Sequence, residues 1–408
     1  MLPKLDSYAA LAVAVGVNLQ PGQPLVISCP VDCADFARLI AEKAYDAGAS
    51  EVVVRWSDDN ITRQKYLRAD DAVFDTLPQW LEKFFYEHAD RGAAIISVFA
   101  EDPETLLGVD PNRIARWQKA SHAKLKDYYE RQMRNDFRWC VVSAPVDAWA
   151  EKVFPGREDK NAALWDAICR AADLRGTPEE TVAVWQDKVK RLGGFAEKLT
   201  AYNFTKLHYK NSLGTDFTVG LPKNHMWSAA GELAADGVRF VANIPTEEVF
   251  TLPDRSTADG VVYAALPLVL SGNIIRDIRL TFRNGKIVES YASEGQEFLD
   301  AELDLDEGAR YLGEVALVPY HSPISALGVL FYNTLFDENA ACHLAFGEAY
   351  PLFTDVTELS KDEIAARGAN SSMTHIDFMI GTPDLSITGI TADGREVPVF
   401  ADGDFAEL

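Results

Sequence analysis

An imidazole and a carboxylate alternate with apolar side chains near the end of the chain, in the segment THIDFMIG (374–381). The apolar residues occupy every second position: Ile376, Phe378 and Ile380. Because successive side chains of a strand point to opposite faces, this spacing predicts a strand that buries the apolar residues. His375 and Asp377 then share the other face, either as a solvated ion pair or as ligands of a common partner.

Three other segments place residues of metal-ligand types among apolar neighbours. They are NIPTEEVFTLP (243–253), LGEVALVP (312–319) and CHLAFGEAYP (342–351). Their polar residues of interest are Glu247, Glu248, Glu314, His343, Glu348 and Tyr350. A carboxylate in apolar surroundings must be paired, protonated or bound to a metal, because burying an isolated charge is costly. None of the three segments contains a lysine or an arginine to pair with it.

Each of these residues also has an ordinary structural explanation. The two adjacent glutamates could begin a helix, where the helix dipole favours acids. Glu314 could pair with Arg310 one turn earlier, His343 could be a core histidine, and Tyr350 could serve packing alone. The other histidines with no comparable acids around them are interpreted as structural: His208, His225 and His321.

As a set, the four segments favour a metal site. Histidines and carboxylates without cysteine form the ligand set expected for zinc, cobalt or manganese in a hydrolytic enzyme. Three carboxylates and two histidines exceed what one catalytic zinc takes from a protein, and they suit two ions that share a carboxylate and a water. We therefore expect a metallohydrolase with two divalent ions: zinc, cobalt, manganese or magnesium.

The motifs NIPTEEVFT, RYLGEVALVP, ENAACHLAFGEAYP and THIDFMIG resemble, in the same order, those of the aminopeptidase T/aminopeptidase S family of thermophilic metallopeptidases. The resemblance runs over nearly the whole chain. It implies a catalytic tyrosine at Tyr350 and these metal ligands: Glu248, Glu314, His343, His375 and Asp377. One departure is His321, which follows Tyr320 where an acidic residue is expected. It touches no implied ligand, but it leaves the local substrate contacts open.

The resemblance also implies an activity and a setting. The expected function is a dinuclear metallo-aminopeptidase that hydrolyses the amino-terminal bond of peptides with a free amino terminus through a metal-bridging hydroxide. Tyr350 would stabilise the oxyanion, and Glu247 is a candidate proton shuttle. The family further implies a homodimer in the cytoplasm. The alternatives are another dinuclear metallohydrolase, an amidase or phosphoesterase, and a two-domain solute-binding protein.

The elements that position these residues fall into two halves. Up to residue 200, four apolar strand-like runs alternate with amphipathic helices: 24–29, 51–56, 93–100 and 138–145. A helix with Phe36, Ile40 and Ala44 on one face lies between the first two runs, and a capping box at Thr177 opens another. This pattern predicts an α/β domain, residues 1–200, with a mostly parallel doubly wound sheet. No glycine-rich phosphate-binding motif follows the first strand, so a nucleotide site is not expected.

The second half, residues 201–408, is predicted to be an α+β domain that carries the metal site. Its strands are joined at three turn signals, a Gly-Thr turn within 211–221, Asn284-Gly285 and Asp393-Gly394. Helical segments are expected near 294–312 and 324–337.

Composition excludes several classes of protein. The 408 residues are 48% hydrophobic and carry a net charge of −23, most of it beyond residue 200, which argues against nucleic-acid binding. No apolar run reaches the roughly 18 residues of a membrane span. The early acid Asp6 and the lack of a small-residue cleavage site argue against export. Five scattered cysteines suit reduced thiols in a cytoplasm.

Overall fold

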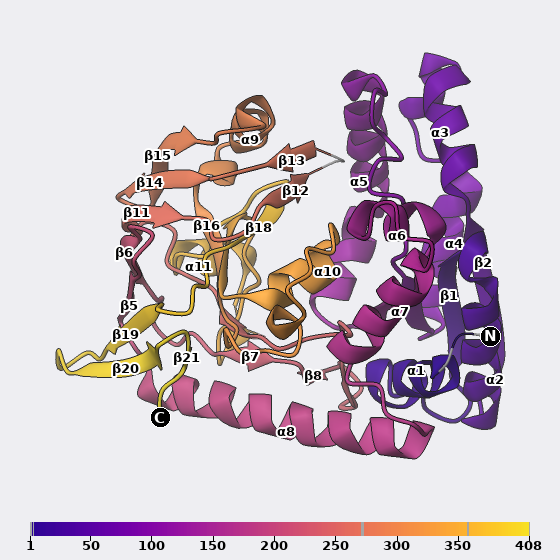
Figure 1. Cartoon of the computed structure of the whole chain (residues 1–408), viewed down its shortest axis with the longest axis horizontal. Helices are drawn as coiled ribbons and strands as arrows, with labels where there is room; N and C mark the ends of the chain where they lie inside the picture. The colour runs from indigo at the N-terminus through magenta and orange to yellow at the C-terminus, as the bar shows by residue number, and fades with distance from the viewer. Residues whose placement is uncertain (1, 3, 271–272, 357–358, 408) are drawn as a thin grey trace. The chain divides into compact units, whose positions relative to one another are not determined.

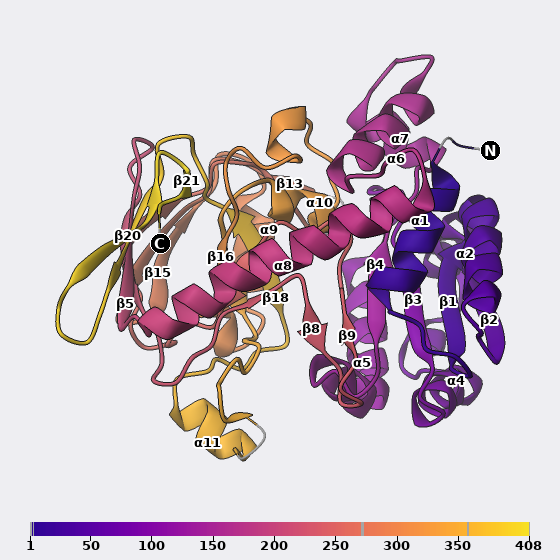
Figure 2. The same cartoon turned by 90° about the horizontal axis from the view of Figure 1, so that it is seen from below.

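The chain forms two compact units in a computed structural model that describes residues 2, 4–270, 273–356 and 359–407. One unit comprises residues 1–188 and 231–245, and the other comprises residues 189–230 and 246–408. The predicted boundary at residue 200 lies inside one long helix, α8 (Pro178–Tyr202), which Figure 2 shows as unbroken.

The first unit is built on a four-stranded parallel sheet of order β2-β1-β3-β4 (Figure 1 labels β1 and β2, and Figure 2 labels all four strands). Its strands are β1 (Pro24–Pro30), β2 (Glu51–Ser57), β3 (Ala94–Val98) and β4 (Trp139–Val142). All four predicted strands are present, and the predicted parallel sheet is confirmed. Parallel neighbours need long crossovers, and helices supply them.

The helices of the first unit connect and cover these strands. They are α1 (Leu5–Leu11), α2 (Ala34–Asp46), α3 (Asp59–Arg68), α4 (Gln79–Asp90), α5 (Pro111–Met133), α6 (Asp147–Val153) and α7 (Lys160–Ala171). α2 buries Phe36, Ile40 and Ala44, as its spacing predicts. α4 and α5 pack in one cluster with Val26 and Ile95 of the sheet. The segment 231–245 belongs to this unit and contains the short pair β8 (Glu232–Leu233) and β9 (Arg239–Phe240).

The second unit contains an eight-stranded sheet of order β15-β14-β11-β6-β5-β19-β20-β21. Its strands are β5 (Lys206–Lys210), β6 (Asp216–Gly220), β11 (Asp259–Tyr263), β14 (Arg279–Arg283), β15 (Lys286–Tyr291), β19 (Ser386–Ile390), β20 (Glu396–Ala401) and β21 (Asp404–Phe405). The hairpin turns predicted at Asn284-Gly285 and Asp393-Gly394 are confirmed. The Gly-Thr turn predicted within 211–221 is confirmed, because residues 211–215 connect the antiparallel strands β5 and β6. Residues 211–213 lie in this loop and not in a strand, since the main chain and side chain of Asn211 both bond to Thr215.

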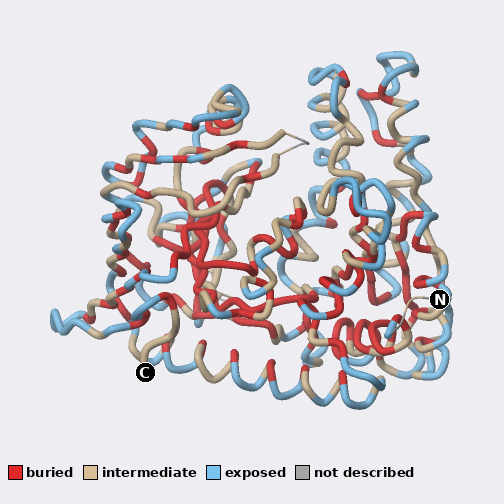
Figure 3. Tube along the Cα trace, in the orientation of Figure 1, coloured by how far each residue is buried: buried red, intermediate tan, exposed pale blue. Residues whose placement is uncertain are grey.

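A five-stranded antiparallel sheet of order β18-β17-β16-β10-β7 completes the second unit. Its strands are β7 (Ser228–Ala229), β10 (Val249–Thr251), β16 (Leu312–Leu317), β17 (His343–Gly347) and β18 (His375–Met379). One apolar core joins this sheet to the eight-stranded one and to the carboxyl-terminal half of α8. Figure 3 shows buried residues gathered along these strands.

Short helices and a small hairpin surround the five-stranded sheet. They are β12 (Leu268–Leu270), β13 (Asn273–Ile275), α9 (Gln296–Leu303), α10 (Thr334–Asp337), the 3₁₀ turn η6 (Glu338–Ala340) and α11 (Lys361–Ala366). The helix predicted near 324–337 is reduced to a 3₁₀ turn at 325–327 and α10, because Asn333 and Asp337 bind main-chain groups of this segment and hold it in a turn-rich path. The five cysteines are free and buried. Among the described residues, no helix combines the length and apolar character that a membrane span requires.

Candidate metal centre

The register of the five-stranded sheet brings the predicted ligands to one face. Glu314 of β16 pairs with Ala345 of β17, and Ala345 pairs with Asp377 of β18, so Glu314 and Asp377 lie in one cross-strand row. His343 is two residues from Ala345, and His375 is two residues from Asp377. Because the side-chain period of a strand is two, all four side chains point to the same side.

Glu248 joins this face from the neighbouring strand. It comes directly before β10, whose Phe250 pairs with Ala316 of β16. Glu248 is two residues from Phe250, as Glu314 is two residues from Ala316, so the two carboxylates share a face. Glu248 therefore precedes a strand, and the alternative of an acid at a helix start is wrong here.

The opposite face of the same strands is apolar. Phe378 and Ile380 are buried in the core between the two sheets, and Ile376 packs against it. Leu344 and Phe346 of β17 belong to the same core. The alternation predicted for residues 374–381 is confirmed, and one sheet thus separates the core from the candidate ligands.

A β-bulge at Gly313 gives Glu314 its orientation. Leu312 pairs with Phe346 in the core, whereas Glu314 pairs with Ala345 on the ligand face, and the register shifts between them. Residues two apart ordinarily share a face, but the extra residue of a bulge reverses this relation. A Cβ at Gly313 would lie 2.1 Å from the main-chain oxygen of Glu348, so the bulge needs glycine.

The ligand atoms converge around Glu314. Nε2 of His343 lies 3.3 Å from Oε2 of Glu248 and 3.5 Å from Oε1 of Glu314. Nε2 of His375 lies 3.8 Å from Oε2 of Glu314 and 3.4 Å from Oδ1 of Asp377. Glu314 thus turns one oxygen toward each histidine. In addition, Glu248, Glu314 and His343 each offer a ligand atom within 4.8 Å of the others, and all three residues are buried.

Both imidazoles are oriented by main-chain carbonyls. Nδ1 of His343 lies 3.2 Å from the oxygen of Ala341, and Nδ1 of His375 lies 2.7 Å from the oxygen of Glu348. A carbonyl oxygen can only accept, so each Nδ1 carries the proton and donates. Nε2 then faces the carboxylates and can bind a cation in place of a proton, the arrangement that metal-binding histidines commonly have.

The cluster holds more negative than positive groups, and the pKa values respond. Burial alone would lower the pKa of His343, but its bonds to Glu248 and Glu314 raise that pKa well above the ordinary value. Burial also opposes protonation of His375, yet Asp377 and Glu314 raise its pKa to about 10. For Asp377, burial would raise the carboxyl pKa, but His375 and then His343 hold it below its usual range. The buried carboxylates therefore stabilise positive charge beside them, either a proton on an imidazole or a cation.

An unpartnered oxygen supports the fit to a cation. Oδ1 of Asp377 is buried, and it has no hydrogen-bond partner within the described part of the chain. Buried polar atoms are nearly always satisfied, so such an atom needs an explanation. A divalent cation held by carboxylate oxygens and imidazole nitrogens provides one, since these are ligands that such ions take in proteins.

The charged groups that could have neutralised the predicted ligands pair with other residues. Arg310 pairs with Asp304 at 2.6 Å, so the alternative of a pair with Glu314 is not supported. The carboxylate of Glu247, buried at 2% exposure, lies 3.8 Å from the guanidinium of Arg191. The remaining histidines of the unit have their own partners: Asp216 for His208, Pro222 for His225 and Asp404 for His321.

Tyr350 lies beside the cluster in the loop after β17. Its ring meets the imidazole of His375 edge to face, with centroids 5.9 Å apart, and it also contacts the ring of Phe250 at 6.3 Å. Glu348, two residues earlier, uses a carboxylate oxygen to accept from the main-chain N–H of Ser372. Glu348 therefore supports the site through its main chain and binds outside the cluster with its side chain.

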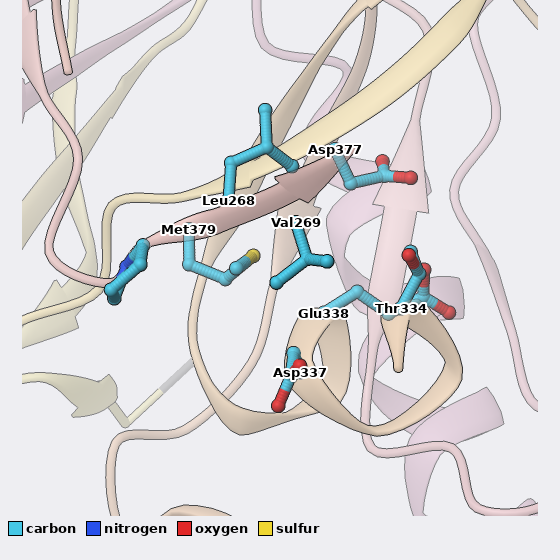
Figure 4. Close-up of a pocket in the computed structure, with 8 residues that line it drawn as sticks. Leu268, Val269, Thr334, Asp337, Glu338, Asp377 and Met379 are labelled. Atoms are coloured by element: carbon cyan, nitrogen blue, oxygen red, sulfur yellow. The ribbon is translucent and has the colours of Figure 1, made fainter. Parts of the chain in front are cut away.

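Glu338 is a further acid at the cluster that the sequence reasoning missed. Burial raises the pKa of Glu338 well above its usual range, and the charges of Asp377 and Glu248 raise it further. It lines a pocket with Asp377, and Figure 4 shows both carboxylates on the same side as Thr334, opposite Met379. The complete lining is Pro267, Leu268, Val269, Thr334, Asp337, Glu338, Asp377 and Met379. In the sequence, the one sign of Glu338 was that it begins the motif ENAACHLAFGEAYP.

Comparison with known proteins identifies the family. The family model described as thermophilic metalloprotease (M29) matches residues 1–405. The chain is 45% identical to aminopeptidase AmpS of Bacillus subtilis (strain 168) over 99% of its length and 98% of that protein, and 43% identical to aminopeptidase 2 of Geobacillus stearothermophilus with the same coverage. Its structure matches that of wild-type AmpT from Thermus thermophilus with a TM-score of 0.92 and 38% identity over 99% of both chains. The predicted resemblance is confirmed: the chain belongs to the thermophilic metalloprotease family M29.

Proposed function

We propose that this chain is a dinuclear metallo-aminopeptidase whose metal-binding catalytic machinery lies in the second unit. The observation that carries the proposal is the position of Glu314, which turns one carboxylate oxygen toward each of two imidazoles whose Nε2 atoms are available. Membership of a metalloprotease family and relatives named aminopeptidases support the same reaction class.

The five predicted ligands divide into two groups around Glu314. Glu248 and His343 would hold one divalent ion, His375 and Asp377 would hold the other, and Glu314 would be shared. Zinc, cobalt, manganese and magnesium are all candidates, and availability decides among metals that similar ligands accept. Bound ions of this kind supply Lewis acidity toward the peptide carbonyl and lower the pKa of water to about 7.

The side chains around the cluster suit the rest of the reaction. Tyr350 can donate its phenolic proton in a hydrogen bond to the oxyanion that forms at the peptide carbonyl, because tyrosine remains neutral near pH 7. Glu338 and Asp377 place carboxyl groups beside the pocket, and their oxygens can accept hydrogen bonds from the ammonium group of a free amino terminus. Leu268, Val269 and Met379 form the apolar part of the lining of the same small pocket.

We also propose that the enzyme acts as a homodimer in the cytoplasm on peptides with a free amino terminus. The dimer rests on the resemblance to the family. Five free cysteines are consistent with a reducing compartment. The net charge of −23 opposes nucleic acid as a partner.

A matched pair of peptides tests the activity. A peptide with a free amino terminus should lose residues one at a time from that end, while its amino-terminally acetylated twin resists. Chelation should stop the cleavage, and readdition of zinc, cobalt or manganese should restore it. Equal cleavage of both peptides would replace the proposal with a general amidase, and hydrolysis of phosphomonoesters alone would replace it with a phosphoesterase.

A further inference from the structure

A buried amide, Asn339 in η6, joins two segments that carry acids of the cluster. Asn339 has no exposed surface, and its side chain makes three hydrogen bonds. Its Oδ1 accepts from the main-chain N–H of Glu247 at 2.8 Å. Its Nδ2 donates to the main-chain oxygen of Leu335 at 3.1 Å and to Oε1 of Glu338 at 3.3 Å.

The first bond fixes the segment that leads into a candidate ligand. Glu247 directly precedes Glu248, and Glu248 directly precedes β10. Holding the N–H of Glu247 therefore restrains the main chain on the side of Glu248 that no strand holds. A displacement there would move the Glu248 carboxylate relative to His343, which lies 3.3 Å away.

The bond from Nδ2 of Asn339 to Oε1 of Glu338 reaches the acid that sequence reasoning missed. Glu338 is adjacent to Asn339, and the charges of Asp377, Glu248 and Glu314 act on its carboxylate. A donor at one oxygen of Glu338 limits its rotation. The bond from Nδ2 to Leu335, in α10, anchors the amide itself.

The three hydrogen-bond partners of Asn339 require an amide side chain at this position. Glu247 presents an N–H that needs an acceptor, while Leu335 and Glu338 present oxygens that need donors. Among side chains of this size, asparagine offers one acceptor and two donors. An aspartate would face two other oxygens, and an apolar residue would leave a buried N–H without an acceptor, which is costly.

We propose that Asn339 is a positioning residue of the metal centre, which sets the place of Glu248 through the main chain of Glu247 and the orientation of Glu338 through its Nδ2. The inference rests on the proposed metal centre but does not depend on the substrate. Groups that orient metal ligands typically change metal affinity about 10- to 100-fold when they are removed.

Metal affinity of the full chain tests this role. The metal-stripped protein and its Asn339→Ala and Asn339→Leu variants would be titrated with Zn²⁺ and Co²⁺ in a calorimeter. Leucine fills the volume that alanine leaves empty, but its side chain makes none of the three hydrogen bonds. Both variants should therefore bind metal roughly 10- to 100-fold more weakly than the unaltered chain.

Asn333→Ala is the matched control. Asn333 is also a buried asparagine of this segment, and it caps α10 by accepting from the main-chain N–H of Leu335 at 3.1 Å. This variant should lose thermal stability but keep its metal affinity, because the hydrogen bonds of Asn333 within the described chain go to Leu335, Phe336 and Asp337 and reach neither Glu247 nor Glu338.

Each outcome decides the matter. If the Asn339 variants lose stability as Asn333→Ala does and keep full metal affinity, Asn339 is structural only. If Asn339→Leu restores the affinity that Asn339→Ala loses, filled volume matters and the hydrogen bonds do not. A chain that binds metal but cleaves no peptide would overturn the proposed function. The metal affinities of the Asn339 variants would still test the role of Asn339. No metal binding by the unaltered chain would overturn both.

Discussion

The ring of Tyr350 stands edge-on to the imidazole of His375, with the two planes at 82° and the centroids 5.9 Å apart. Tyr350 can donate a hydrogen bond, and this contact places it beside His375. The Nε2 of His375 faces Asp377 and Glu314. The ring of Phe250 contacts the same tyrosine. Two aromatic neighbours therefore hold the Tyr350 ring at the cluster, whether or not its hydroxyl takes part in chemistry.

The variant Tyr350→Phe separates these two roles. It deletes a hydroxyl but keeps the ring contacts, so folding and metal content should be unchanged. If the hydroxyl stabilises the oxyanion, kcat should fall roughly 100- to 1,000-fold with a smaller change in KM. Steady-state kinetics with metal analysis of the same sample measure both. A variant that retains most of its kcat with full metal would make the tyrosine a packing residue.

Removing a ligand should have a different signature. His375→Ala deletes an imidazole whose Nε2 is 3.4 Å from Asp377, so metal content and activity should fall together. The control is His208→Ala, which removes a histidine of the same unit that pairs with Asp216 on β6. It should keep both properties. Full metal content in His375→Ala, measured by atomic emission after dialysis, would remove His375 from the ligand set.

Metal removal should destabilise the chain. Glu248 and Glu314 offer oxygens within 4.8 Å of each other, and two like charges at 4 Å repel by about 4 kcal/mol at an effective dielectric constant of 20. A ligand at 100 times its dissociation constant adds about 2.7 kcal/mol to stability. Chelation should therefore lower the Tm by several degrees, and divalent metal should restore it. Identical calorimetric melting curves before and after verified metal removal would argue against a shared metal cluster.

Gly313→Ala tests the bulge that orients Glu314. Its Cβ would meet the main-chain oxygen of Glu348 at 2.1 Å, so the bulge must shift. Overpacking of this kind costs about 1–3 kcal/mol, and metal affinity should fall as well because Glu314 moves.

Gly193→Ala in α8 is the control for this glycine. Its Cβ meets nothing within 4 Å, and alanine in a helix interior gains up to about 1 kcal/mol over glycine. Urea unfolding and metal titration compare the two variants. If Gly313→Ala binds metal as the parent does, the bulge does not control the orientation of Glu314.

His225 should make stability depend on pH, away from the metal cluster. Its Nδ1 donates to the oxygen of Pro222 at 2.9 Å, and its buried Nε2 has no hydrogen-bond partner in the described ranges. Burial lowers the pKa of His225, although the bond to Pro222 opposes the shift. The unfolded chain then binds a proton at a higher pH than the native chain does. His225 contributes stability above about pH 6.5 that is lost as the pH falls below that value.

The comparison with His225→Phe isolates this contribution. The variant should be less stable than the parent at pH 7.5, where the parent gains from its bond to Pro222. The difference should narrow by up to about 1.4 kcal/mol per pH unit between the two pKa values. Urea unfolding at pH 7.5, 6.5 and 5.5 measures it. A constant difference across this range would show that His225 does not titrate on unfolding.

The ligand set could be predicted where it follows a simple strand period. His375 and Asp377 alternate with apolar residues, and β18 has the faces that this alternation implies. Glu314 is different, because its strand contains a bulge and a period of two would place it with Leu312 in the core. The register of β16 against β17 reveals the reversal, because it pairs Leu312 with Phe346 but Glu314 with Ala345. This register depends on contacts between segments that are separate in the sequence.

Glu338 and Arg191 show the other limit. Glu338 lies in a single 3₁₀ turn, where no periodicity marks which side chain faces inward. Glu247 pairs with Arg191, which lies far from it in the sequence. Considering each motif separately could not reveal this pair. Likewise, the loop at 211–215 depends on the bonds of Asn211 to Thr215, so the preceding strand β5 ends at Lys210, earlier than the turn signal suggested.

The placement of the ligands on separate strands has a consequence for biosynthesis. Glu248, Glu314, His343 and the pair on β18 come from four segments, and the last of them closes the edge of the sheet. A chain emerging from the ribosome therefore lacks the complete site until β18 has been made and paired. Contacts between distant segments also form late because their loop-closure entropy must be overcome first. The ion assigned to His375 and Asp377 would thus bind only after β18 is paired, so capture of both ions would require the finished molecule.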